Sequence, residues 1–289
     1  VILFQGLHLS EGMTMSAPPL LLNLGCGHRL HPAWVNADLV AQCPGVMVID
    51  VSRGLPFPDA HFDTVYHAAM LEHLRREEVP AFLRECHRVL KPGGVLRIAV
   101  PDLETICRLY LQKLEAAAAG QPGAEADHEW MTIELLDQAV RERSGGGMVD
   151  FLRRNPLPNE PFVLERTGEE GRELLALLRT PAGAPPPAAP SWWRHVRQRI
   201  RRGILARLLG AQGERALAIG RFRLSGEVHH WMYDRVSLAR LLRAAGLIEP
   251  RQHSAAESRI ANWKGYHLDT LPRGAATKPD LFYMEAVKP

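Results

Sequence analysis

Residues 22–27 read Leu-Asn-Leu-Gly-Cys-Gly, a short apolar stretch that ends in a Gly-x-Gly turn. Glycine lets the backbone pass close to a ligand because it has no Cβ. An acidic residue, Asp38, comes near the end of the next strand-like run, Trp34–Leu39. Open α/β sheets bind their ligands at the carboxyl ends of the strands. The stretch therefore predicts a ligand crevice in which Asp38 accepts hydrogen bonds from the two hydroxyls of a ribose.

Strand-like and helix-like segments alternate around this turn. Short apolar runs bounded by turn residues predict strands at Leu20–Leu24, Trp34–Leu39, Val46–Ile49, Phe62–Tyr66, Val95–Val100 and Leu281–Val287. An apolar stripe predicts a helix over Glu77–Leu90, stopped by Lys91-Pro92-Gly93-Gly94. Asp234 can cap a second helix, whose core face is Val236, Leu238, Leu241, Leu242 and Ala245. This alternation predicts an α/β fold with a mostly parallel sheet and helices on both faces.

The pattern changes in the middle of the chain. Helices are predicted at Leu103–Ala119, Trp130–Arg143 and Glu169–Leu178, and the proline-rich residues 180–191 are interpreted as a linker. We expect residues 105–231 to form a mainly helical insertion after the fifth strand, which caps the predicted ligand site. The surrounding core is then made of residues 15–104 and 232–289.

The first residues are left out of the fold prediction. Val1–Gly6 resembles the end of an engineered protease site, so residues 1–14 are interpreted as a remnant. The expected native start is Met13 or Met15, and we see no export signal.

Composition narrows the class of protein. The chain has 289 residues, of which 46% are hydrophobic and 23% charged, which excludes a fibrous or wholly disordered chain. No apolar run approaches the roughly 18 residues of a membrane-spanning helix. The net charge of +3 is too small to imply a nucleic-acid partner. The four cysteines form no CxxC pair, which favours a reduced, cytoplasmic protein.

Two common nucleotide sites are excluded by spacing. A nicotinamide fingerprint needs a third glycine where Leu30 stands, and an acidic residue about 20 residues further on. Asp38 comes too soon after Gly27, and the chain has no Gly-Lys-Ser/Thr phosphate loop. The predicted ligand is therefore a nucleoside without a phosphate chain.

The stretch from Leu21 to Pro101 resembles class I S-adenosylmethionine-dependent methyltransferases of the small-molecule type. The matching pieces, in family order, are Asn23–Gly27, Trp34–Asp38, Leu55–Asp59, Phe62–Val65, Leu71–Leu74 and Arg88–Gly94. The resemblance implies a Rossmann-like, seven-stranded sheet with its last strand antiparallel. It also implies S-adenosylmethionine as the cofactor and S-adenosylhomocysteine as its product.

The resemblance also assigns binding roles. Asp38 holds the ribose hydroxyls, Asp50 and Val51 contact the adenine, and His67 and Ala68 lie near the sulfonium. The full set of implied cofactor-binding residues is Asn23, Gly25, Cys26, Gly27, Asp38, Leu39, Asp50, Val51, His67 and Ala68. Two features depart from the family. Ala68-Ala69 stands where many relatives have Ser-His, and the short span from Gly27 to Asp38 requires a short or distorted first helix.

A hydroxyl acceptor needs a base, and histidine suits that task near neutral pH. The proposed bases are His229 and His230, with His67 and His73 as further candidates. The alternative is a histidine that bonds to backbone at a helix entry. No metal site is expected, because Glu72-His73 lacks a recognisable third ligand in the sequence. Cys26 is interpreted as a small residue that fills the turn rather than as a nucleophile.

These residues predict an S-adenosylmethionine-dependent methyltransferase that acts on a hydroxyl, or an amine, of a small metabolite, sugar or natural product. Methylation of RNA or protein is one alternative, and a cofactor-binding protein that does no chemistry is another. Residues 192–209 form a basic amphipathic pattern that fits either a helix over the active site or contact with a membrane surface. The oligomeric state is left open.

Overall fold

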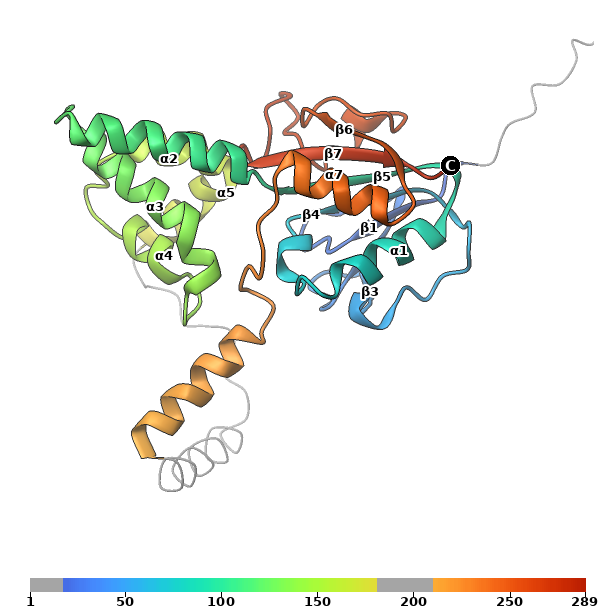
Figure 1. Ribbon diagram of the computed structural model, residues 1–289, viewed down its shortest axis with the longest axis horizontal. Coiled ribbons are helices and arrows are strands. Elements are labelled where there is room, and N and C mark those ends of the chain that lie inside the picture. The colour runs from blue at the N-terminus through green and yellow to red at the C-terminus, as the bar shows by residue number, and fades with distance from the viewer. Residues whose placement is uncertain (1–17, 181–209) are drawn as a thin grey trace, which may run out of the picture.

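The computed structural model describes residues 18–180 and 210–289 (Figure 1). Their centre is a seven-stranded sheet in the order β3-β2-β1-β4-β5-β7-β6. The strands are β1 (Leu21–Leu24), β2 (Trp34–Asp38), β3 (Met47–Val48), β4 (Phe62–Ala68), β5 (Leu90–Pro101), β6 (Ile248–His253) and β7 (Leu281–Val287). Strands β3, β2, β1, β4 and β5 pair in parallel, whereas β7 is antiparallel to both β5 and β6. The predicted sheet with its antiparallel last strand is confirmed.

One face of the sheet is covered by two helices. Helices α1 (Val79–Val89) and α7 (Arg235–Ala244) pack on side chains such as Leu22, Val65 and Leu96, which are fully buried. Asp234 caps α7 as predicted, since its carboxylate accepts hydrogen bonds from the backbone N–H groups of Val236 and Ser237.

The prediction for α7 is wrong at one residue of its core face, Val236. Val236 is 64% exposed, whereas Leu238 and Leu242 are fully buried. At 3.6 residues per turn, Val236 lies about 200° around the helix axis from Leu238. It therefore points to solvent.

The opposite face is covered mainly by the long connection between β6 and β7, which contains the short helix α8 (Trp263–Tyr266). Its aromatic side chains pack edge to face on Trp34 and Tyr66. Arg97 is buried there and forms ion pairs with Asp269 at 2.8 Å and Glu285 at 2.7 Å. These contacts hold the connection against the sheet.

Three local predictions differ from the structure. Residues 25–33 form turns, so the expected short first helix is absent. Residues 91–94, predicted to separate a helix from a strand, are the irregular start of β5. Strand β6 was not predicted, because it is a polar edge strand with no apolar run.

Four helices follow β5 and gather at one end of the sheet (Figure 1). They are α2 (Leu103–Ala118), α3 (Ala124–Val140), α4 (Gly146–Leu152) and α5 (Glu160–Arg179). They bury a core of their own around Trp130, Met131 and Phe151. Helix α4 was not predicted because three glycines open it, and α5 begins earlier than expected and is kinked at Gly168. A further helix covers residues 210–223.

The chain leaves the sheet and returns to it at the same place. The backbone N–H of Leu103 donates to the carbonyl of Tyr233 at 3.1 Å, and the N–H of Asp102 donates to the carbonyl of Asp280 at 2.9 Å. The helices are thus attached at the carboxyl ends of β4 and β5, above the predicted crevice.

The amphipathic pattern at 192–209 and most of the linker at 180–191 lie outside the described residues. Among the helices of residues 18–180 and 210–289, none combines the length and apolar character needed to span a bilayer.

Candidate active site

The Gly-x-Gly turn after β1 is tied to the end of β2. Cys26 donates its backbone N–H to the carbonyl of Ala37 at 3.2 Å, and Gly27 donates to Oδ2 of Asp38 at 2.8 Å. Gly25 has a φ of +64°, and a Cβ there would stand 2.8 Å from Cγ of Met70. Glycine therefore allows the loop after β4 to pack directly against the turn.

A cavity of about 440 Å³, here called the cofactor cavity, opens beside this turn. Five predicted cofactor residues line it, namely Gly25, Asp38, Leu39, Asp50 and Val51. Leu24, Ile49 and Leu74 add apolar surface. Asp50 caps the short helix η1 (Val51–Arg53). A hydrogen bond from the Ser52 side chain is the main cause that lowers the pKa of Asp50, so its carboxylate is ionised at neutral pH.

The other predicted residues at the turn lie on its far side. A second hollow of about 470 Å³ is lined by Asn23, Cys26, Gly27 and Ala68, and it shares Gly25 and Ala69 with the cofactor cavity. The amide of Asn23 donates to the carbonyl of Arg29 at 2.9 Å and to Oδ1 of Asn36 at 3.0 Å. Asn23 therefore braces the loop. Burial raises the pKa of the Cys26 thiol to about 11, which is consistent with a packing role.

The predicted role of His67 does not fit its position. The side chain is 0% exposed, lines none of these cavities and packs edge to face on Phe82 of α1. Alternate residues of a strand point to opposite faces, so His67 lies in the core with Val65. Burial lowers its pKa to about 3. His67 is neutral and out of reach of the cofactor cavity, and we remove it from the candidate bases and cofactor ligands.

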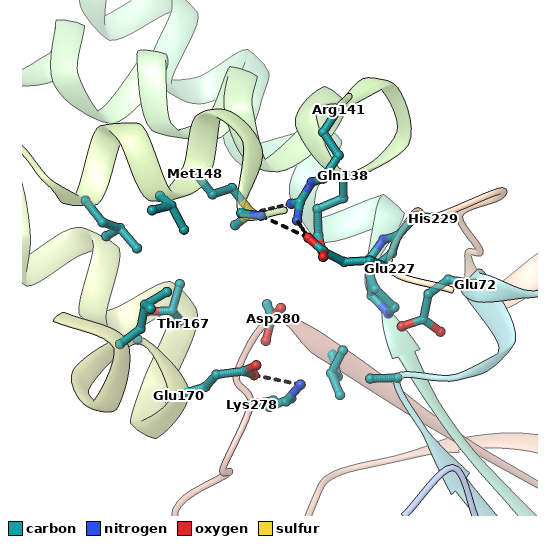
Figure 2. A pocket seen from close by; sticks show the side chains of 18 of the residues that line it. Glu72, Gln138, Arg141, Met148, Thr167, Glu170, Glu227, His229, Lys278 and Asp280 are labelled. Atoms are coloured by element: carbon teal, nitrogen blue, oxygen red, sulfur yellow. Dashed lines mark hydrogen bonds and ion pairs between the residues drawn. The ribbon is translucent and has the colours of Figure 1, made fainter. Parts of the chain in front are cut away.

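A third cavity of about 350 Å³, here called the acceptor cavity, lies between the sheet and the helices (Figure 2). Its walls come from the loop after β4, from α3, α4 and α5, from residues 227–229 and from residues 278–281. Ala69 and His73 line both this cavity and the cofactor cavity. The two cavities therefore meet at the end of β4.

Ionic side chains surround the acceptor cavity. Arg141 pairs with Asp137 at 2.9 Å and with Glu227 at 3.1 Å, and Lys278 pairs with Glu170 at 2.6 Å. Figure 2 shows Asp280 between these pairs, at the floor of the cavity. Burial raises the pKa of Asp280 to about 6.

The two predicted histidine bases have different positions. His229 is 6% exposed and lines the acceptor cavity, where its ring contacts that of His73 edge to face at 4.7 Å. Burial lowers the pKa of His229 to about 3, so its ring is neutral at pH 7. His230 lines neither cavity, and its backbone N–H donates to the carbonyl of Glu72 at 2.7 Å. The geometry favours His229 and not His230.

Sequence reasoning missed most of the acceptor cavity. Glu72 was considered as part of an incomplete metal-ligand pair with His73, whereas both residues line the cavity. Arg141, Lys278 and Asp280 were not considered at all. The available signal was Leu71-Glu72-His73, which belongs to one of the family pieces and follows the end of β4.

Comparison with known proteins supports the same class of fold and the same kind of cofactor turn. A family model described as a methyltransferase domain matches residues 30–98. Together with the strand order, this match identifies residues 21–101 as the core of a class I S-adenosylmethionine-dependent methyltransferase domain.

Two curated relatives illustrate the extent of the similarity. The 2-phytyl-1,4-naphtoquinone methyltransferase of Synechococcus elongatus is 35% identical over 115 residues, which are 35% of this chain and 47% of the relative. A probable S-adenosylmethionine-dependent methyltransferase of Mycobacterium tuberculosis is 28% identical over 156 residues, 52% of this chain and 51% of the relative. The chain thus spans about half the length of the curated relatives it matches.

Among solved structures, an S-adenosylmethionine-dependent methyltransferase from Methanosarcina mazei aligns over 95% of this chain and 94% of its own. The sequence identity is 14% and the TM-score 0.37, which is too low to support an argument about function.

The residues of the cofactor cavity fit the cofactor that the family implies, S-adenosylmethionine. Gly25 lines the cavity with its backbone alone, so no side chain separates the turn from a ligand. Oδ1 of Asp38 receives only a 3.3 Å bond from the N–H of Val40 and has capacity to accept from ribose hydroxyls. No lysine or arginine is among the described residues that line the cofactor cavity.

Proposed function

We propose that this protein transfers a methyl group from S-adenosylmethionine to a hydroxyl, or less often an amine, of a small molecule bound in the acceptor cavity. The observation that carries the proposal is the junction of the two cavities at Ala69 and His73. A donor on Asp38 and Asp50 and an acceptor among the helices would meet at this junction.

When bound, S-adenosylmethionine supplies an electrophilic methyl group on a sulfonium sulfur. The residues of the chain have to position the acceptor and keep water out, since orientation supplies much of the acceleration in such displacements. Ala69 contributes only a methyl side chain at the junction, which leaves room for the reacting groups. His229 lines the acceptor cavity, and a histidine is the most common general base in such sites, so we assign it that role in the metal-free protein.

The size and the charges of the acceptor cavity favour a small acceptor over an RNA or a protein. The cavity of about 350 Å³ is at the lower end of the usual range for small-molecule sites, roughly 300–1,000 Å³. Its charged side chains are largely paired with one another, so they form no basic surface for a phosphate backbone.

The experiment is a methyl-transfer assay with methyl-labelled S-adenosylmethionine and a panel of phenols, sugars, amines and quinones. Quinones are included because a relative is named for a naphthoquinone substrate. We expect a methylated product and S-adenosylhomocysteine with at least one class. At low S-adenosylmethionine concentration, Asp38→Ala should yield about 10- to 100-fold less of both, because one hydrogen bond to the cofactor is lost. Asp59→Ala is the matched control, since Asp59 lies on the surface in an ion pair with Arg88. Cofactor binding without any product across the panel would favour the non-catalytic alternative.

A further inference from the structure

Three side chains that the sequence places far apart meet at one end of the acceptor cavity. Glu72 and His73 belong to the short helix η2 (Leu71–His73), and His229 comes from the segment that leads back to the sheet. One ligand atom from each lies within 4.8 Å of the others. Figure 2 shows Glu72 and His229 side by side at this end of the cavity.

The carboxyl group of Glu72 has no partner. The residue is 0% exposed, and neither Oε1 nor Oε2 makes a hydrogen bond. Buried polar groups are nearly always paired, and an unpaired one needs an explanation such as a bound ion. Glu72 lines the acceptor cavity, so a ligand in that cavity can supply the missing partner.

His73 is oriented as a metal-binding histidine would be. Its Nδ1 lies 3.3 Å from the carbonyl oxygen of Val228. A carbonyl can only accept, so Nδ1 carries the proton and the lone pair is on Nε2. Histidines that bind metals usually donate their other ring N–H to a carboxylate or a backbone carbonyl in this way.

The segment around Val228 is fixed from both sides. The N–H of His229 donates to the carbonyl of Gln138 at 3.0 Å, and the N–H of His230 donates to the carbonyl of Glu72 at 2.7 Å. The segment that orients His73 therefore also delivers His229 to the cluster. This long-range contact supplies the third ligand that Glu72-His73 lacks in the sequence.

We propose that Glu72, His73 and His229 bind one divalent transition-metal ion, with Zn²⁺ as the best match. Two histidines and one glutamate are a known catalytic zinc set, which leaves at least one coordination position open. Metal–ligand bonds of about 2.1 Å place tetrahedral ligand atoms about 3.4 Å apart, so the side chains draw together when the ion binds. Imidazole nitrogen favours zinc and its neighbours over magnesium.

The surrounding charges are compatible with a cation. Arg141 and Lys278, the basic residues of the cavity, are both already paired with carboxylates. Asp280 lines the same cavity and lies between the pairs. The cavity thus has no unpaired positive charge next to the cluster among the residues that line it.

The role of the ion rests on the proposed function. Because Glu72, His73 and His229 all line the acceptor cavity, an open position on the ion would be available to an oxygen donor of the acceptor, such as a hydroxyl next to a carbonyl or a second hydroxyl. A metal ion lowers the pKa of a hydroxyl that it binds, so the hydroxyl would lose its proton to water and no side-chain base would be needed. In the loaded form His229 is then a ligand rather than a base.

The test measures metal binding on the full chain, without an assay of methyl transfer. The protein is stripped with a chelator, titrated with Zn²⁺ by calorimetry, and titrated with Co²⁺ while its visible absorption bands are recorded. We expect one ion per chain. Loss of a ligand in His229→Ala or Glu72→Gln should weaken binding at least as much as loss of a supporting contact, which costs about 10- to 100-fold. His230→Ala is the control and should bind like the wild type.

The outcomes separate the two proposals. No Zn²⁺ binding, or equal affinity in wild type, His229→Ala and Glu72→Gln, overturns the metal site and leaves Glu72 as a neutral buried acid. Zn²⁺ binding without methyl transfer to any acceptor removes the proposed function and keeps the site. If Glu72→Gln does not fold, His73→Ala carries the same expectation, checked by circular dichroism.

Discussion

The cofactor cavity and the acceptor cavity meet at Ala69 but are built in opposite ways. The cofactor cavity draws nearly all of its lining from residues 24–74, with a small contribution from 225–227. The acceptor cavity combines the loop after β4, three helices and two segments from the last quarter of the chain. A cofactor common to many proteins is held by a local, recognisable stretch, whereas the specific partner is held by an assembly that only the fold creates.

The largest expected effect separates turnover from cofactor binding. His229→Ala removes the residue proposed as base in the metal-free protein and as a ligand in the zinc-loaded one. In either case the acceptor loses help with its proton, so methyl transfer should fall by about 10²- to 10⁴-fold. Affinity for S-adenosylhomocysteine should stay unchanged, because His229 does not line the cofactor cavity. Steady-state kinetics and calorimetry check this, and a parallel loss of cofactor affinity would mean that the two cavities are not independent.

The reverse pattern is expected for Asp38→Ala. A hydrogen bond to a charged group contributes about 1.5–3 kcal/mol, so affinity for S-adenosylhomocysteine should fall by about 10- to 100-fold. Zn²⁺ affinity should not change, because Asp38 is remote from the Glu72 cluster in the chain and lines only the cofactor cavity. Calorimetry with S-adenosylhomocysteine and with Zn²⁺ tests both expectations. If Asp38→Ala binds S-adenosylhomocysteine as tightly as the wild type, Asp38 does not hold the ribose.

Two Gly→Ala substitutions, one beside each cavity, should lower the stability of the fold by similar amounts but affect different ligands. Gly25 and Gly168 have φ values of +64° and +63°, and a Cβ on Gly168 would stand 2.6 Å from the carbonyl oxygen of Thr277. A left-handed conformation costs an L-residue about 1–2 kcal/mol, so Gly25→Ala and Gly168→Ala should each lower the free energy of unfolding by at least that amount. Gly25→Ala should also weaken cofactor binding. Gly168→Ala should instead raise the KM of the acceptor. If both substitutions changed cofactor binding and the acceptor KM equally, the two cavities would not be separate sites.

The smallest effect is expected for His230→Ala. Its side chain lines neither cavity, and its contact with Glu72 is made by the backbone. Turnover and both affinities should match those of the wild type. A large loss of turnover would return His230 to the candidate bases.

The same contrast explains what the sequence could predict. Strands β1, β2, β4 and β7 and helices α1 and α7 follow from local apolar patterns, and the cofactor turn follows from the glycines and Asp38 beside it. Strand β6 is polar and lies at the sheet edge, so periodicity does not reveal it. The prediction for His67 was wrong because it relied on closeness to the motif in the sequence. The face of the sheet to which a side chain points depends instead on the alternation of residues along the strand.

The acceptor cavity could not be predicted, for a different reason. Lys278 and Asp280 reach it only because the connection before β7 packs across the sheet, and Glu227 and His229 reach it only through the return from the helices. No local pattern records such contacts.

The most direct test of the account is a crystal structure of the full chain with S-adenosylhomocysteine. We expect the ribose hydroxyls on Asp38, the adenine beside Asp50 and Val51, and the sulfur facing Ala69 at the mouth of the acceptor cavity. A nucleoside bound elsewhere, or with its sulfur turned away from Ala69, would contradict the central claim that the two cavities form one methyl-transfer site.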